Sequence, residues 1–189
     1  MLHSLTTPRF VIRRFVQDDH LAVAELMGDP PTPQAQQERR SWLDWTVQNY
    51  QALEALKQPP YGDYAIVEKG GVRPIGAVGL VPSYGPFAQL AGPEFGGAQG
   101  LAPCSPEIGL YYEVHPDWRR RGVAAEAASA LISFARSELK LGRIVATTTH
   151  DNAGSIGVMR RLGMQILRNP HPEPFWFQTV GVLRLVEVP

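Results

Sequence analysis

The spacing of hydrophobic and polar residues predicts an alternation of strands and helices along the chain. RFVIRRF alternates and predicts a strand over 9–15, whereas the tryptophans and leucines of 34–57 recur near helical spacing. Gln58-Pro59-Pro60 ends that helix, because proline cannot continue one. By the same reasoning we expect a short helix beginning near Asp18 or Asp19, a hairpin over 64–82 turning at Lys69–Gly71, strands at 107–114, 143–150, 164–167 and 175–185, and helices at 122–139 and 153–162.

These elements follow the order β-α-α-β-β-β-α-β-α-β-β, which indicates a mixed sheet with helices packed on its faces. The exception is the segment 82–106, where ten of 25 positions are Gly or Pro and the one charged residue is Glu94. A loop of that length in a compact domain is functional or disordered. We therefore expect a single domain over 1–189 that carries an 82–106 insertion loop.

Charge and cysteine content narrow the class of protein. Lysine and arginine number 18, as do aspartate and glutamate, so the net charge is zero and a generic nucleic-acid binder is disfavoured. The one cysteine, Cys104, has no zinc-ligand pattern around it, so no metal is expected. The chain lacks an apolar run long enough to span a bilayer and a secretory signal, so we expect a cytoplasmic protein without membrane contact.

The most informative junction is WRRRGVAAEA, where a strand over 107–114 runs into a helix. The first N–H groups of a helix have no partner inside it and attract anions. Gly122 lets an anion approach the backbone, and the alanines that follow keep the approach clear. The pattern predicts a pyrophosphate site; the alternative is a solvated basic turn.

Arg119-x-x-Gly122-x-Ala124 resembles the acetyl-CoA motif of the GNAT acetyltransferase superfamily, [R/Q]-x-x-G-x-[G/A]. EIGLYYEVHPDWRRRG resembles the family's central strand, and TTTHDNAGSIGVMRRLGM resembles its Asn-x-x-Ser/Ala helix. TPRFVIRRFVQDD is similar to the opening of the RimJ/RimL-type branch, which acetylates ribosomal-protein N-termini and related amines. Apart from 82–106, the resemblance covers nearly the whole chain.

The resemblance implies an α/β GNAT-like fold: a mixed, mostly antiparallel sheet of about seven strands flanked by about four helices. It also implies an acetyl-CoA-dependent N-acetyltransferase, in which a primary amine attacks the thioester directly in a ternary complex. The acceptor would be a protein N-terminus or a small-molecule amine. The residues that the resemblance assigns to the cofactor are Tyr112, Val114, Arg119, Arg121, Gly122, Val123, Ala124, Ala125, Asn152 and Ser155.

Within this set the expected roles differ. Residues 121–125 would hold the CoA pyrophosphate through backbone N–H groups, with Arg119 or Arg120 assisting. The pantetheine arm would pair with the backbone around 112–114, where the family's central strand splays from its neighbour. The Val114 N–H would then stabilise the oxyanion. Asn152 would contact the pantetheine arm or set the bend of the cofactor.

The catalytic acid and base are harder to assign. Many relatives carry a tyrosine seven residues after the asparagine, but Met159 stands there and cannot donate a proton, so Ser155 is the expected thiolate acid. Glu107 is ranked slightly ahead of Glu113 as the base. Asn152 and Ser155 have a simpler interpretation too, as the N-cap and N3 residues of the helix that follows.

Two other functions stay open at this point. One is a non-catalytic acyl-CoA-binding or regulatory module on the same fold. The other is an RNA- or ribosome-associated protein using Arg119–Arg121 and Arg160–Arg161, which the neutral net charge disfavours. The near absence of charge in 82–106 tilts the expected acceptor toward a peptide N-terminus or a mostly uncharged amine. A homodimer is possible.

Overall fold

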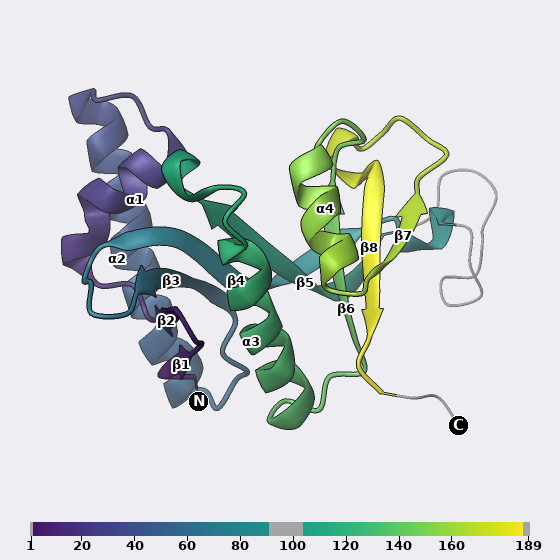
Figure 1. Ribbon diagram of the computed structural model, residues 1–189, viewed down its shortest axis with the longest axis horizontal. Helices are drawn as coiled ribbons and strands as arrows, with labels where there is room; N and C mark the ends of the chain where they lie inside the picture. Colours follow the sequence, from purple (N-terminus) through teal and green to yellow (C-terminus); the bar gives the residue numbers. More distant parts are fainter. Residues whose placement is uncertain (1, 91–103, 187–189) are drawn as a thin grey trace. The chain divides into compact units, whose positions relative to one another are not determined.

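The computed structural model describes residues 2–90 and 104–186, which divide into two compact units (Figure 1). The first unit comprises Met1–Val81 and Tyr111–Phe134, and the second comprises Pro82–Leu110 and Ala135–Pro189. Among the described residues, no helix is long and apolar enough to cross a membrane.

The first unit holds an antiparallel meander and the two N-terminal helices. Its elements are β1 (Ser4–Thr6), β2 (Phe10–Arg13), α1 (His20–Met27), α2 (Pro33–Ala55), β3 (Gly62–Glu68), most of β4 (Pro74–Gly85), the end of β5 (Ser105–Val114) and most of α3 (Val123–Ser137). Strands β1 to β4 pair antiparallel in sequence order. The interior of β3 is buried over 64–67, and the Tyr50 ring of α2 packs on the Tyr64 ring at a centroid distance of 5.4 Å.

The second unit continues the sheet. It contains the start of β5, β6 (Arg143–Thr148), α4 (Ala153–Arg161), β7 (Gln165–Arg168) and β8 (Thr179–Arg184). Strand β6 is parallel to β5 and antiparallel to β8, which also pairs with β7. The strand order is therefore β1-β2-β3-β4-β5-β6-β8-β7. The core of this unit is an apolar cluster of Phe87, Leu90, Val145, Phe177, Val180 and Val182.

The predicted fold class is confirmed, with eight strands where about seven were expected. The extra strand is β1, whose three residues are too few for an alternating pattern to be recognised. The strand predicted over 175–185 is wrong at its start, because Phe175–Phe177 form a 3₁₀ turn after Pro174 and β8 begins at Thr179.

The Gly/Pro-rich segment is also shorter than the predicted 82–106 loop. Strand β4 continues to Gly85, and β5 already begins at Ser105. Between them, Phe87 and Leu90 are buried in the apolar cluster of the second unit, so hydrophobic burial holds this stretch despite its glycines and prolines. The remaining part, 91–103, lies outside the described residues.

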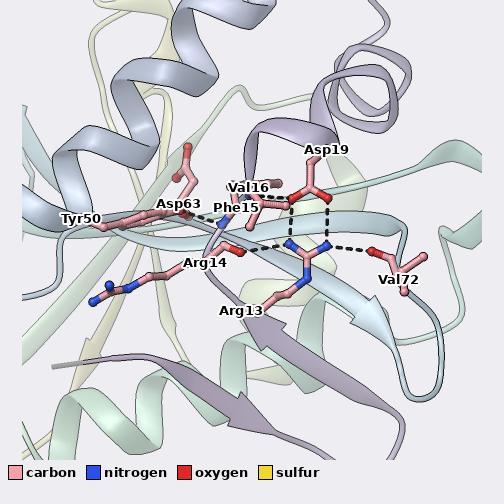
Figure 2. Close-up of polar contacts among 8 residues, drawn as sticks. All are labelled: Arg13, Arg14, Phe15, Val16, Asp19, Tyr50, Asp63 and Val72. Carbon is pink, nitrogen blue, oxygen red and sulfur yellow. Dashed lines mark hydrogen bonds and ion pairs between the residues drawn. The ribbon is translucent and has the colours of Figure 1, made fainter.

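A bidentate ion pair fastens the end of β2 to the start of α1 (Figure 2). The Arg13 guanidinium lies 2.7 and 2.9 Å from the two carboxylate oxygens of Asp19 and donates to the carbonyls of Arg14 and Val72. Asp19 also accepts the Val16 N–H at 2.9 Å. The guanidinium therefore joins the β2 end, the α1 start and the β3–β4 turn, and the Asp19 carboxylate raises the pKa of Arg13.

We expect Asp19→Asn to lower the free energy of unfolding by about 2–3 kcal/mol, because one partner of a largely buried ion pair loses its charge. The matched control is Asp18→Asn, an identical change at the adjacent, exposed residue. Urea unfolding monitored by circular dichroism measures both variants. Equal stability of the two would show that the ion pair contributes nothing.

Candidate active site

The turn between β5 and α3 is shaped by a proline and two residues with positive φ. Pro116 begins a 3₁₀ turn that ends at Trp118, capped by the His115 side chain, which accepts the Asp117 N–H. Arg120 at φ +59° and Gly122 at φ +77° then reverse the chain. Glycine adopts that conformation without strain, which is the local reason for Gly122 at the entrance to α3.

The start of α3 has the properties expected of an anion site. Its first intrahelical hydrogen bond runs from the Glu126 N–H to the Gly122 carbonyl at 3.0 Å, so the N–H groups just before Glu126 have no partner within the helix. The side chains of Val123, Ala124 and Ala125 are buried in the protein. The backbone at 122–125 therefore bears no bulky exposed side chain.

Two charged side chains near the start of α3, Glu126 and Arg121, contact neighbouring side chains. The Glu126 carboxylate accepts hydrogen bonds from Thr7 and from the Arg9 backbone and guanidinium. Burial would raise the pKa of Glu126, but these hydrogen bonds outweigh it and lower the pKa. The guanidinium of Arg121 lies over the Trp118 ring, 5.4 Å from its centroid. The acidic residue of the first turn is thus neutralised by Arg9, and Arg121 stays at the surface.

Arg119 joins the end of β5 to the turn. Its Nε donates to the Val114 carbonyl at 2.9 Å and its terminal nitrogen to Glu113 Oε1 at 3.0 Å. The same carboxylate oxygen accepts the Val114 N–H at 3.2 Å. The predicted oxyanion donor is therefore held by a carboxylate, and the arginine of the motif is engaged with both neighbours.

Strand β5 contacts β4 close to Glu113 and Val114. The His115 N–H donates to the Ile75 carbonyl at 2.9 Å, and a Cβ at Gly76 would lie only 2.7 Å from the Glu113 carbonyl oxygen. With β6, the described register of β5 consists of one pair, Gly109 with Val145.

Glu107, ranked first as the base, is engaged elsewhere. In the parallel register of β5 and β6 it stands opposite Arg143, whose Nε lies 3.0 Å from Glu107 Oε2 and whose terminal nitrogen contacts Oε1. The carboxylate side chain is 12% exposed. The ion pair with Arg143 thus occupies both carboxylate oxygens, and the role of Glu107 as the base stays a prediction.

Asn152 and Ser155 lie together at the start of α4. The Asn152 side chain accepts the Ser155 N–H at 3.0 Å, which makes Asn152 the N-cap of this helix. Met159, one turn further on, is fully buried. The structure thus places Asn152 beside Ser155 in the second unit, whereas Val114, Arg119 and residues 121–125 belong to the first.

Sequence reasoning missed Asp63, the second residue of β3. Its Oδ1 is buried and has no hydrogen-bond partner among the described residues, and burial raises the pKa of this carboxyl from 3.8 to about 6. A carboxylate with a raised pKa destabilises the folded state at neutral pH, here by about 3 kcal/mol. In the sequence Asp63 is one acidic residue that precedes the apolar run YAIV. That pattern is too common to identify a functional residue.

Comparisons with known proteins agree on one family. The acetyltransferase (GNAT) domain model matches residues 9–165. Two Bacillus subtilis proteins described as uncharacterised N-acetyltransferases are similar: YnaD, 37% identical over 31% of this chain and 34% of its own, and YoaA, 25% identical over 87% of this chain and 84% of its own. The alignment with YnaD thus spans about a third of that protein.

Two solved structures show the same fold. A GNAT-family acetyltransferase from Bacillus anthracis superimposes with a TM-score of 0.66 at 18% identity, covering 97% of this chain and 99% of its own. RimL, the ribosomal L7/L12 α-N-protein acetyltransferase in complex with coenzyme A, has a TM-score of 0.61 at 14% identity, with coverages of 95% and 96%.

We expect Glu107→Gln to lower the free energy of unfolding by about 1–3 kcal/mol, because the Arg143 guanidinium loses its charged partner. If Glu107 only joins β5 to β6, the folded variant keeps its turnover. Urea unfolding and steady-state kinetics on the same preparation separate the two effects. A stable variant with turnover reduced by two orders of magnitude would support Glu107 as the base.

Proposed function

The chain belongs to the GNAT acetyltransferase family, and on that premise we propose that it moves the acetyl group of acetyl-CoA to a primary amine by direct attack within a ternary complex. The observation that carries this proposal is the entrance to α3. There a left-handed Gly122 precedes helical N–H groups that have no partner within the helix. An anion with the spacing of a pyrophosphate fits such a backbone, since the side chains of 123–125 are turned inward.

The proposal gives the residues of the first unit the following roles. Residues 121–125 bind the CoA pyrophosphate through backbone N–H groups, and Arg119 adds positive charge beside them. Bound acetyl-CoA supplies the thioester that the amine attacks. The Tyr112–Val114 backbone holds the pantetheine arm, and the Val114 N–H stabilises the developing oxyanion. For this, the Val114 N–H must exchange Glu113 Oε1 for the thioester oxygen.

The Glu113 carboxylate occupies hydrogen-bonding groups that acetyl-CoA is proposed to use. In the structure this carboxylate binds the two groups that acetyl-CoA needs, the Arg119 guanidinium and the Val114 N–H. Cofactor binding releases this carboxylate next to the thioester. Glu113 therefore stays a candidate for proton transfer, with Arg119 shared between it and the cofactor.

In the second unit, Ser155 is proposed to protonate the departing CoA thiolate, and Asn152 to contact the pantetheine arm. The N-cap role of Asn152 supports this, because the cap fixes the first turn of α4 on which Ser155 lies. Met159 is buried and without an acidic proton, so no tyrosine-like acid is available at that position.

The acceptor is proposed to be a protein N-terminus or a small-molecule amine. One structural neighbour, RimL, acts on the ribosomal L7/L12 N-terminus, but its 14% identity carries only the fold. We also propose that residues 1–189 work as one catalytic domain, since the family match over 9–165 draws on both units. Cytoplasmic location and a homodimer stay predictions, and no comparison favours a non-catalytic CoA-binding module.

The cofactor site is tested at Gly122. We expect Gly122→Glu to weaken CoA binding at least about 100-fold, because a carboxylate beside the helix start opposes the pyrophosphate. The matched control is Gly122→Ala, which adds the strain of a side chain at positive φ without the charge. Calorimetric titration with CoA measures both. Unchanged affinity in a folded Gly122→Glu protein would overturn the assignment.

The thiolate acid is tested at Ser155. We expect Ser155→Ala to lower kcat by about 10- to 100-fold with little change in CoA affinity, because the hydroxyl acts on the leaving group. Free thiol release from acetyl-CoA is followed with a panel of a peptide with a free N-terminus, amino acids, spermidine, an aminoglycoside and benzylamine. A loss of CoA affinity with kcat retained would make Ser155 a binding residue instead.

A further inference from the structure

We propose that Asp63 binds the acceptor as an ammonium ion and removes its proton before the amine attacks, an inference that rests on the proposed acetyltransferase function. The first ground is the absence of any cation beside it. Among the described residues Asp63 forms no ion pair, and its Oδ1 has no hydrogen-bond partner although it is buried. In Figure 2 the contact at Asp63 goes from Tyr50 to its backbone carbonyl, and no contact is drawn to the carboxylate.

The arginines of the surrounding elements are each paired with a different acid. Arg13 binds Asp19, Arg14 binds Glu54, and Arg39 binds Asp29. These pairs leave Asp63 without an ion-pair partner among the described residues, with one carboxylate oxygen buried and the residue as a whole partly exposed. A buried charge of this kind is costly unless a partner arrives, and the partner that fits a carboxylate is a cation with N–H donors.

The Asp63 carboxylate is packed against a glycine of the neighbouring strand, where a Cβ would also lie 2.5 Å from the Gly62 carbonyl oxygen. Asp63 on β3 stands opposite Gly79 on β4, and a Cβ at Gly79 would lie 2.7 Å from Asp63 Oδ1. Any side chain at position 79 would therefore enter the space that the carboxylate uses. Asp63 is the second residue of β3, and a glycine that accommodates an unpaired carboxylate oxygen there is expected of a binding position.

Tyr111 supplies the other side of this position. It lies on β5, which follows β4 in the strand order, and its hydroxyl contacts Met27 Sδ of α1 at 3.7 Å. Burial raises the pKa of Tyr111, and the charges of Asp63 and Glu113 raise it further, so the hydroxyl is within electrostatic reach of both. Tyr111 and Glu113 are two residues apart and share one face of β5. Tyr111 therefore lies on the face of β5 that also carries Glu113, whose carboxylate binds the Val114 N–H.

The proton balance of the step is complete. The acceptor R–NH₃⁺ transfers one proton to the Asp63 carboxylate, giving R–NH₂ and a carboxylic acid. The amine nitrogen then bonds to the thioester carbonyl carbon, the C–S bond breaks, and the second nitrogen proton goes to the CoA thiolate. Asp63 finally loses its proton to solvent. A carboxyl whose pKa lies near neutrality suits this exchange.

The substrate class follows from this role. The acceptor is a primary amine that is protonated at neutral pH, and it enters as the cation. Titration near pH 6 belongs to Asp63, because the groups that interact with it electrostatically, Tyr50 of α2 and Tyr111 of β5, both have their pKa raised above the ordinary tyrosine value. Those hydroxyls stay protonated across the range in which Asp63 changes charge.

The test compares Asp63→Asn with Asp44→Asn, the same change at an exposed aspartate of α2. With the best acceptor of the amine panel, we expect Asp63→Asn to lower kcat/KM at least about 100-fold at pH 7 and to leave CoA affinity unchanged. The wild type should lose kcat/KM below about pH 6, the pKa of Asp63. This acid limb should vanish in Asp63→Asn and persist in Asp44→Asn.

A second experiment separates the removal of the proton from the binding of the amine. Trifluoroethylamine is largely neutral at pH 8 and benzylamine is protonated, so the loss in Asp63→Asn should be smaller for trifluoroethylamine. The variant is expected to fold, since neutralising a buried carboxylate raises the unfolding temperature at pH 8. If Asp63→Asn keeps its kcat/KM and its acid limb, the proposed role of Asp63 is wrong, whereas the proposed acetyltransferase function stands. A wild type that binds CoA but acetylates no amine would overturn the proposed function, and this inference with it.

Discussion

The candidate cofactor site depends on the guanidinium of Arg119. By binding the Val114 carbonyl and the Glu113 carboxylate it fixes the last residues of β5 against the turn that leads into α3. The turn can then reverse through Arg120 and Gly122, and α3 begins with its N–H groups available. Without that contact, the strand end and the helix start would be two separate features. With it, they form one surface on which an anion and a thioester can lie together.

The same contact explains how the site exists before the cofactor binds. An N–H group and a guanidinium directed at one point are stable only if an acceptor occupies that point, and Glu113 provides it. The pair is partly exposed, so water and an incoming anion can compete for both groups. The protein therefore holds the Val114 N–H, the proposed oxyanion donor, with a contact that is weak enough to exchange.

How much of this could be predicted from sequence depends on how far apart the interacting residues lie in the chain. The Arg119–Ala124 motif was readable because strand end, turn and helix start are consecutive, and the elements themselves have strong periodicity. Strand β1 is too short for a period, and Phe175–Phe177 carry strand-like residues in a 3₁₀ turn. Asp63 was not readable at all, because its environment depends on the register that sets it opposite Gly79.

Three carboxylates are candidates for the base, and they differ in the partners that each has in the structure. Glu107 is bound through both oxygens by Arg143 and would have to give up that partner before it could accept a proton. Glu113 shares Arg119 with the cofactor and regains freedom only when the cofactor takes that arginine. Asp63 has no cation among the described residues, and burial alone raises its pKa to about 6. A general base must be ionised at neutral pH and able to accept a proton, and of the three candidates only Asp63, the proposed base, could do so without first giving up an arginine partner among the described residues.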